Sequence, residues 1–262
     1  MIAARPLVLI ALRLLLALPG TAAAQAQNTV DLRLVLAVDA SGSVDRTRFE
    51  LQKQGYVAAF RNPRVLGAIR SGPTQAIAVT MMQWTGPQLH VQVVPWKWIG
   101  DAGSAEAFAA AIEDAPRQLF GGGTSISGAI EYGLALLRES PFGGRRRVID
   151  VSGDGSNNRG RPAQLARDEA VAEGVGINGL PILAIEPDLD RYYYDNVIGG
   201  PGAFMVAAES YETFADAILK KLITEIADVD DRKIRRSAAA RYTPATKAGA
   251  IACGRPACNT SP

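Results

Sequence analysis

Three short segments of the chain combine glycine with oxygen-bearing side chains. The first, "VDASGSVD", places Asp39, Ser41 and Ser43 at alternate positions. The second, "FGGGTSIS", places Thr124 after three glycines, and the third, "DVSGDGSNN", places Asp154 between two glycines. Carboxylate and hydroxyl oxygens are hard ligands that suit Mg²⁺, and also Mn²⁺ or Ca²⁺. If the fold brings the three segments together, they predict a site for a divalent cation.

Each of these segments, taken alone, is more typical of a turn or a helix cap than of a binding site. Their joint occurrence, each at a predicted strand end or helix start, favours a site. Two carboxylates about 4 Å apart repel each other by roughly 4 kcal/mol at an effective dielectric constant of about 20, and a divalent cation removes that cost. Asn157 and Asn158 could orient Asp154 or line the rim of the site, although turn formation is the simpler interpretation.

Short apolar segments alternate with amphipathic ones along the body of the chain. This alternation predicts an α/β fold with three layers: a doubly wound, mostly parallel sheet with helices on both faces. Residues 89–96 alternate in polarity and contain Pro95, which predicts one antiparallel edge strand. In such sheets ligands bind at the carboxyl ends of the strands, where the three segments are expected to lie. The predicted strands are 32–39, 75–84, 89–96, 146–154, 178–186 and 202–208, and the predicted helices are 44–60, 104–115, 125–140, 161–174 and 210–227.

The two ends of the chain differ in composition from its body. An arginine, a short apolar run and small residues before Ala24 have the layout of a secretory signal peptide. The apolar run is short for a membrane span and is interrupted by Arg13. We therefore expect an exported protein, periplasmic or secreted, with no stable membrane span after cleavage. The predicted division is a signal peptide at 1–24, one domain at 30–228 and a basic, disordered tail at 229–262.

The charges of the mature chain cancel but are unevenly placed. Residues 1–24 contribute two arginines and no acid, so the rest of the chain carries 26 basic and 26 acidic side chains. From Arg232 onward there are seven basic residues and no acidic ones. An acidic body with a basic tail is not typical of a nucleic-acid-binding protein. Both cysteines, Cys253 and Cys258, lie in this tail, and after export they could form a small-loop disulfide.

The three oxygen-bearing segments resemble the von Willebrand factor type A (vWA) domain and its metal-ion-dependent adhesion site (MIDAS). Asp39, Ser41 and Ser43 match the D-x-S-x-S motif, and Thr124 and Asp154 match the other two positions. The resemblance covers about residues 30–228 and implies a Rossmann-like fold. It also implies that the hydroxyls bind the cation directly, that the aspartates often act through water, and that a carboxylate of a partner protein completes the coordination. "IDVSGDGSNN" and "MQWTG" are similar to a secreted bacterial subgroup of unassigned function (DUF1194-like).

An enzyme interpretation starts from the same residues. Asp39 and "SGDGSNN" resemble the nucleophile and the late acidic motif of haloacid-dehalogenase-like phosphohydrolases. Those enzymes carry a second acid where this chain has Ser41 and another aspartate where it has Asn158, so the general acid is missing. A serine hydrolase would need a base, and His90 is the only histidine. We therefore expect a binding protein and not an enzyme; a structural role without metal is the third alternative.

Overall fold

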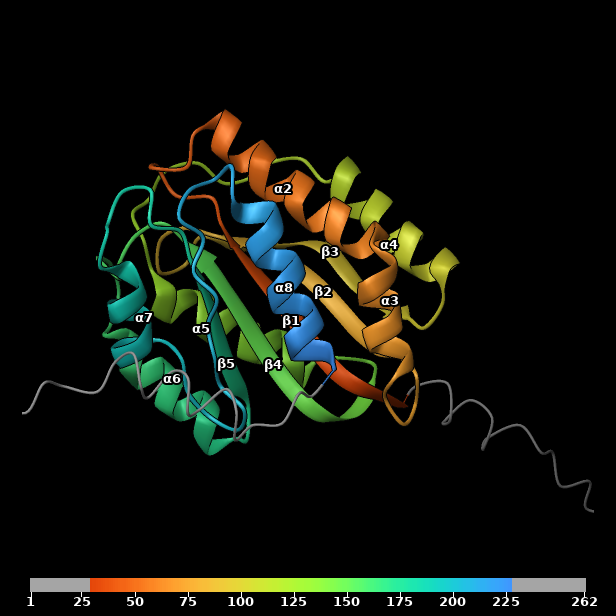
Figure 1. Ribbon diagram of the computed structural model, residues 1–262. Coiled ribbons are helices and arrows are strands. Elements are labelled where there is room, and N and C mark those ends of the chain that lie inside the picture. Colours follow the sequence, from red (N-terminus) through yellow and green to blue (C-terminus); the bar gives the residue numbers. More distant parts are fainter. Residues whose placement is uncertain (1–28, 228–262) are drawn as a thin grey trace, which may run out of the picture.

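The computed structural model describes residues 29–227 (Figure 1). Five strands form one sheet in the order β3-β2-β1-β4-β5. All neighbouring strands are parallel except β3, which runs antiparallel to β2 at one edge. The predicted α/β architecture, with one antiparallel edge strand, is therefore confirmed. The strands are β1 (Thr29–Asp39), β2 (Ile77–Trp84), β3 (His90–Ile99), β4 (Gly143–Gly153) and β5 (Gly176–Pro181).

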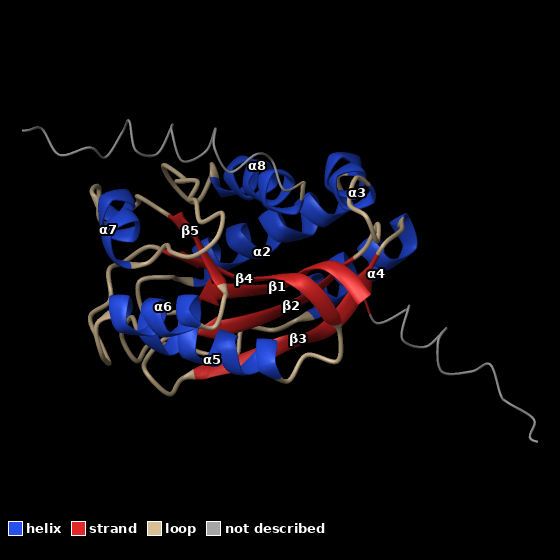
Figure 2. Ribbon diagram, turned by 90° about the horizontal axis from the view of Figure 1, so that it is seen from below, coloured by secondary structure: helices blue, strands red, loops and turns tan. Residues whose placement is uncertain are grey.

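Helices cover both faces of the sheet, as Figure 2 shows in side view. Along β1, successive side chains point to opposite faces, so that Leu34 and Leu36 pack into one core and Val35 and Ala37 into the other. The first core is closed by α2 (Arg46–Arg61), α3 (Pro63–Arg70), α4 (Ala102–Asp114) and α8 (Phe214–Ile226). The second core is closed by α5 (Ile126–Arg138), α6 (Ala163–Ala172) and α7 (Leu189–Asn196).

Four elements differ from the sequence prediction. The strand predicted at 202–208 is wrong: this segment makes only isolated bridges, Met205 with Gly179 and Ala208 with Ile182. The chain enters this segment through turns at Gly200 and Gly202, both with positive φ, so hydrogen bonding beside β5 begins only at Phe204. Strand β5 ends at Pro181 and does not continue to 186, since a turn follows. Helices α3 and α7 were not predicted, although Asn62 caps α3 with its side chain and proline follows in the first turn.

Several predictions fall outside the described residues. These are the signal peptide at 1–24, the tail from 229 to 262 and the disulfide between Cys253 and Cys258. Between residues 29 and 227, none of the helices combines the length and the apolar character that a membrane span requires.

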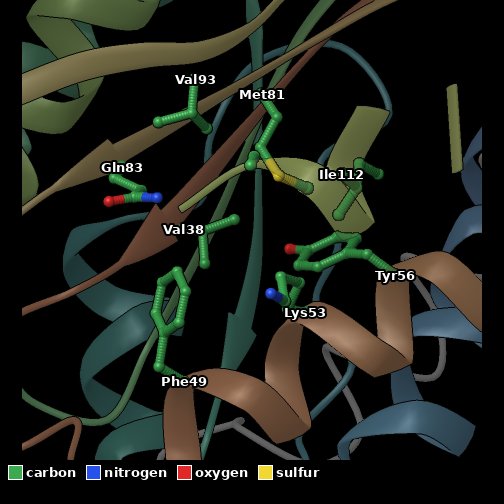
Figure 3. Close-up of a pocket in the computed structure, with 9 residues that line it drawn as sticks. Val38, Phe49, Lys53, Tyr56, Met81, Gln83, Val93 and Ile112 are labelled. Atoms are coloured by element: carbon green, nitrogen blue, oxygen red, sulfur yellow. The ribbon is translucent and has the colours of Figure 1, made fainter. Parts of the chain in front are cut away.

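A small pocket lies between the sheet and the helices α2 and α4 (Figure 3). Apolar side chains such as Val38, Met81 and Ile112 line it, together with the hydroxyl-bearing Tyr56. Its volume of about 10 Å³ is close to the space that one water molecule needs. This face of the sheet is therefore closely packed around the pocket.

Candidate metal centre

The carboxyl ends of β1 and β4 lie side by side in the middle of the sheet. Asp39 is the last residue of β1, and the preceding Val38 pairs with Ser152 of β4. Asp154 follows directly after the end of β4. The arrow of β4 points to the upper left in Figure 1, where the loops that carry these residues gather. Thr124 reaches the same edge because the next residue, Ser125, donates its backbone N–H to the carbonyl of Thr85 after β2 (2.7 Å).

Hydrogen bonds link four of the five predicted ligands directly. Ser43 Oγ donates to Asp154 Oδ1 (2.6 Å), and the hydroxyls of Ser41 and Ser43 are 3.2 Å apart. The backbone N–H of Ser41 donates to Asp39 Oδ1 (2.7 Å). Thr124 Oγ1 lies beside the same turn, 3.7 Å from the position that a Cβ on residue 155 would take. The structure thus gathers the five residues at one place, and their role as metal ligands stays a prediction.

Glycines allow these loops to approach one another so closely. Gly121, Gly122 and Gly123 have φ angles of 71°, 95° and 83°, a conformation that side-chain-bearing residues rarely adopt. The resulting turn brings the loop before Thr124 against the Asp39–Ser43 segment. At the end of β4, a Cβ on Gly153 would come within 2.9 Å of Asp39 Oδ2, so a larger residue there would push against the carboxylate.

The two carboxylates are deeply buried and their charge is not neutralised by a basic side chain. Asp39 is 0% exposed and Asp154 is 1% exposed, and within residues 29–227 neither forms an ion pair. Burial, with a further contribution from the neighbouring Asp154, raises the pKa of Asp39 to about 7. Asp39 Oδ2 has no hydrogen-bond partner. A buried carboxylate oxygen without a partner costs free energy, which a bound cation would recover.

The donor set of this centre fits a hard divalent cation. It offers two carboxylates and three hydroxyls, all of them oxygen ligands. Elsewhere in the described part of the chain, no group of three or more His, Cys, Asp or Glu residues could hold a metal ion. The centre differs from such groups because three of its five candidate ligands are hydroxyls.

Tyr211 and Arg48 adjoin the centre, and sequence reasoning did not single them out. Tyr211 donates its hydroxyl to Asp154 Oδ2 (2.8 Å), so that both oxygens of Asp154 accept a hydrogen bond from a neutral hydroxyl. The Arg48 guanidinium lies 5.4 Å from the centroid of the Tyr211 ring and donates to the carbonyl of Ser43 (2.7 Å). No local pattern marks Tyr211, because it meets Asp154 only after the segment before α8 has folded back over the sheet.

Asn157 and Asn158 have a role that the prediction of a simple turn does not cover. Asn158 Oδ1 accepts from the backbone N–H of Thr124 (2.9 Å), and Asn157 Oδ1 accepts from that of Ser127 (3.1 Å). Both side chains therefore tie the Asp154 turn to the start of α5, and neither contacts the Asp154 carboxylate. Glu186, which was also not singled out, supports this turn by accepting the backbone N–H of residue 156 with both oxygens (3.1 Å each).

Comparison with solved structures shows the same fold in vWA proteins. The pilus adhesin SpaC from Lactobacillus rhamnosus GG is 19% identical with a TM-score of 0.55, over 77% of this chain and 31% of that one. A von Willebrand factor type A protein from Catenulispora acidiphila is 16% identical with a TM-score of 0.54, over 75% and 43%. Proximal thread matrix protein 1 from the mussel byssus, described with a zinc-occupied MIDAS motif, is 16% identical with a TM-score of 0.55, over 77% and 49%. This chain thus spans less than half of each of these proteins.

Sequence comparison gives one further finding. Residues 29–230 match a family model described as "Protein of unknown function (DUF1194)". No curated protein matches the chain by sequence.

Proposed function

Because the chain belongs to the DUF1194 family and has the fold of a vWA domain, we propose that it is a cation-dependent binding domain. In this proposal the centre holds a divalent cation, and a carboxylate of a partner protein docks on that cation. The observation that carries the proposal is the buried, unpartnered Asp39 Oδ2 beside a second buried carboxylate, with no ion pair to either within residues 29–227. A purely structural role would leave this cost without compensation.

The residues of the centre would have two different roles in holding the cation. Ser41, Ser43 and Thr124 would offer hydroxyl oxygens, and Asp39 and Asp154 would supply the negative charge, directly or through water. A divalent cation supplies positive charge and a coordination position that an incoming carboxylate can fill. Mg²⁺ is our first choice and Mn²⁺ or Ca²⁺ the next, because all ligands are oxygens. Since the mussel protein is described with zinc in its MIDAS, Zn²⁺ belongs in any metal comparison.

Binding is favoured over catalysis by the surroundings of Asp39. Two residues beyond Asp39, Ser41 donates its backbone N–H to that carboxylate and places its hydroxyl against Ser43. A phosphohydrolase would need a proton donor at this position, and a serine hydroxyl is a poor general acid. With the signal-peptide layout at residues 1–24, we further propose that the domain acts outside the cytoplasm, in the periplasm or after secretion.

Calorimetric titration of the full chain with Mg²⁺, Mn²⁺, Ca²⁺ and Zn²⁺ tests this proposal. We expect one bound ion per chain, and at a free concentration 100 times Kd a gain of about 2.7 kcal/mol in the free energy of unfolding. Asp39→Asn should abolish both effects. Asp45→Asn is the matched control, because Asp45 caps α2 just beyond the motif and asparagine caps equally well.

The proposal fails if no ion binds and the wild-type protein unfolds identically in Mg²⁺ and in EDTA. Hydrolysis of a generic phosphate ester that disappears in Asp39→Asn would instead support the phosphohydrolase alternative.

A further inference from the structure

Exposed apolar side chains gather at the same edge of the sheet as the candidate metal centre. Leu89 lies in the loop after β2, Phe120 shortly before Thr124, and Ile185 in the loop after β5. Phe120 is 70% exposed, the largest value among the large apolar side chains of residues 29–227. A cluster of apolar side chains that faces solvent beside a polar site is typical of an interaction surface.

The exposed ring of Phe120 is held in place beside the metal centre. The Arg117 guanidinium lies 4.7 Å from the centroid of this ring and 5.5 Å from that of the buried Phe49. Arg117 Nη2 donates to the carbonyls of Ala40 (2.9 Å) and Ser41 (3.1 Å). Arg117 therefore fixes the Phe120 loop against the D-x-S-x-S segment. An aromatic side chain that is already ordered loses little conformational entropy when a partner packs on it.

Leu89 extends the apolar surface towards Thr124. Its Cδ1 lies 2.5 Å from the position that a Cβ on Gly122 would take, so it rests directly on the glycine turn. Leu89 is 45% exposed. Phe120 and Leu89 thus border the turn that leads to Thr124, next to the place where a partner's carboxylate would reach a cation.

Arginines give this surface a positive charge. Arg117 and Arg159 form no ion pair within residues 29–227, although Arg117 is close enough to Asp39 to interact with it electrostatically. In the same range Arg48 forms one ion pair, with the exposed Asp45 at 4.0 Å, and also interacts electrostatically with Glu212. Arg48 and Arg117 donate to backbone carbonyls of the D-x-S-x-S segment, and Arg159 packs on the glycine turn, where its Cγ is 2.5 Å from a Cβ position on residue 123. Three arginines around a centre that binds a cation favour a negatively charged partner.

We propose that these side chains select the partner of the metal centre, and we call them the rim: Arg48, Leu89, Arg117, Phe120 and Arg159. The partner that fits the rim is an exposed acidic segment of another protein, in which the carboxylate that reaches the cation is flanked by a large apolar residue. That apolar residue packs on Phe120 and Leu89, while the arginines attract the surrounding negative charge. This inference rests on the proposed function, because the carboxylate needs the cation.

Peptide selection on the full chain in Mg²⁺ tests the inference. Two phage-displayed libraries of seven-residue peptides have random flanks around a fixed centre, which is aspartate in one and asparagine in the other. The aspartate library should yield peptides with an aromatic or large aliphatic residue next to the centre, and the asparagine library should yield none. In calorimetry the best peptide should bind Phe120→Ala about tenfold more weakly than wild type.

The control variant is Trp98→Ala, which removes an exposed aromatic side chain at the opposite edge of the sheet. It should keep the wild-type peptide affinity within about twofold, and both variants should bind Mg²⁺ like wild type. The inference is overturned if Phe120→Ala binds the best peptide as tightly as wild type, if the selected peptides show no apolar neighbour, or if none is selected although Mg²⁺ binds. Absence of Mg²⁺ binding by wild type would overturn the proposed function first, and the inference with it.

Discussion

Within residues 29–227 the molecule contains two pairs of buried carboxylates, and only one of them is neutralised by a basic side chain. Asp39 and Asp154 lie at the carboxyl edge of the sheet without a basic partner in the described chain. The second pair, Asp150 of β4 and Glu225 of α8, lies between the sheet and α8. Both carboxylates contact Lys221 of α8, whose Nζ is 2.7 Å from Asp150 Oδ2 and 3.0 Å from Glu225 Oε2. All of these side chains are at most 1% exposed. One pair therefore carries its own cation, and the other would need a cation from solution.

Glu225 of this pair makes a further polar contact, whereas the oxygens of Asp150 have no hydrogen-bond partner among the described residues and rely on the ion pair with Lys221. Asn178 donates to Glu225 Oε1 (2.8 Å) and accepts from the backbone N–H of Phe204 (2.9 Å). Burial lowers the pKa of Lys221, but Asp150 and Glu225 outweigh it, so the pKa is raised and the lysine stays charged. A covalently attached cation makes compensation permanent, whereas an exchangeable one can be withdrawn. The attached cation suits a structural role that fixes α8 to the sheet. An exchangeable cation would suit a centre at the sheet edge whose binding depends on the ion.

The largest expected effect comes from removing the built-in cation. Lys221→Met leaves two buried carboxylates without compensation and should lower the free energy of unfolding by about 3–5 kcal/mol at neutral pH. Urea denaturation measures this loss. Lys220→Met is the matched control, because Lys220 is the adjacent, exposed residue of the same helix. A loss in Lys221→Met no greater than in Lys220→Met would show that the two carboxylates do not need the lysine.

A somewhat smaller effect is expected from pH on the protein without metal. The folded-state pKa of Asp39 is about 7, above its ordinary value of 3.8, so the folded protein holds a proton that the unfolded chain releases. The free energy of unfolding should therefore fall by a few kcal/mol as pH rises from about 4 to 7. Urea denaturation in EDTA across this range measures the slope. Asp39→Asn should be flatter than wild type; equal slopes for the two proteins would contradict the assignment to Asp39.

The smallest effect concerns the orientation of the Asp154 carboxylate. Tyr211→Phe removes the hydrogen bond to Asp154 Oδ2 and should weaken Mg²⁺ binding about tenfold, as loss of a hydrogen bond to a metal ligand commonly does. The cost in unfolding free energy should be only about 1 kcal/mol. Tyr56→Phe is the control, because its buried hydroxyl donates to Ser152 and touches none of the five candidate ligands. If both variants bind Mg²⁺ equally well, Tyr211 does not orient the centre.

Much of the fold was predictable because its signals are local. Continuous apolar runs ending in polar turns located β1, β2 and β4, and the spacing of apolar residues located the long helices. The strand predicted at 202–208 was wrong because an apolar run alone does not say whether a neighbour pairs with it along its length. Helix α7 was missed because only one of its three adjacent tyrosines, Tyr193, is fully buried, which blurs the helical pattern.

The five candidate ligands were predictable from the sequence, but most of the residues around them were not. Its five residues belong to short motifs at strand ends, so the fold class sufficed to place them at one edge. Tyr211 and Glu186 were not predictable, since each reaches the centre through a tertiary contact between segments far apart in the chain. Arg48 lies only five residues beyond Ser43, whose carbonyl accepts its hydrogen bond, but no motif marks it. The unpartnered oxygen of Asp39 is likewise visible only in three dimensions, because burial and hydrogen bonding together define it.

The order in which the site's segments occur along the chain has a consequence for folding kinetics. Asp39, Thr124 and Asp154 are separated by 85 and then 30 residues of sequence, so the complete coordination cradle exists only after β1, β4 and the start of α5 have met. An ion that needs all three segments would gain little in a partly folded transition state. It would therefore act chiefly by slowing the unfolding rate, giving the protein a longer native lifetime wherever the ion is present.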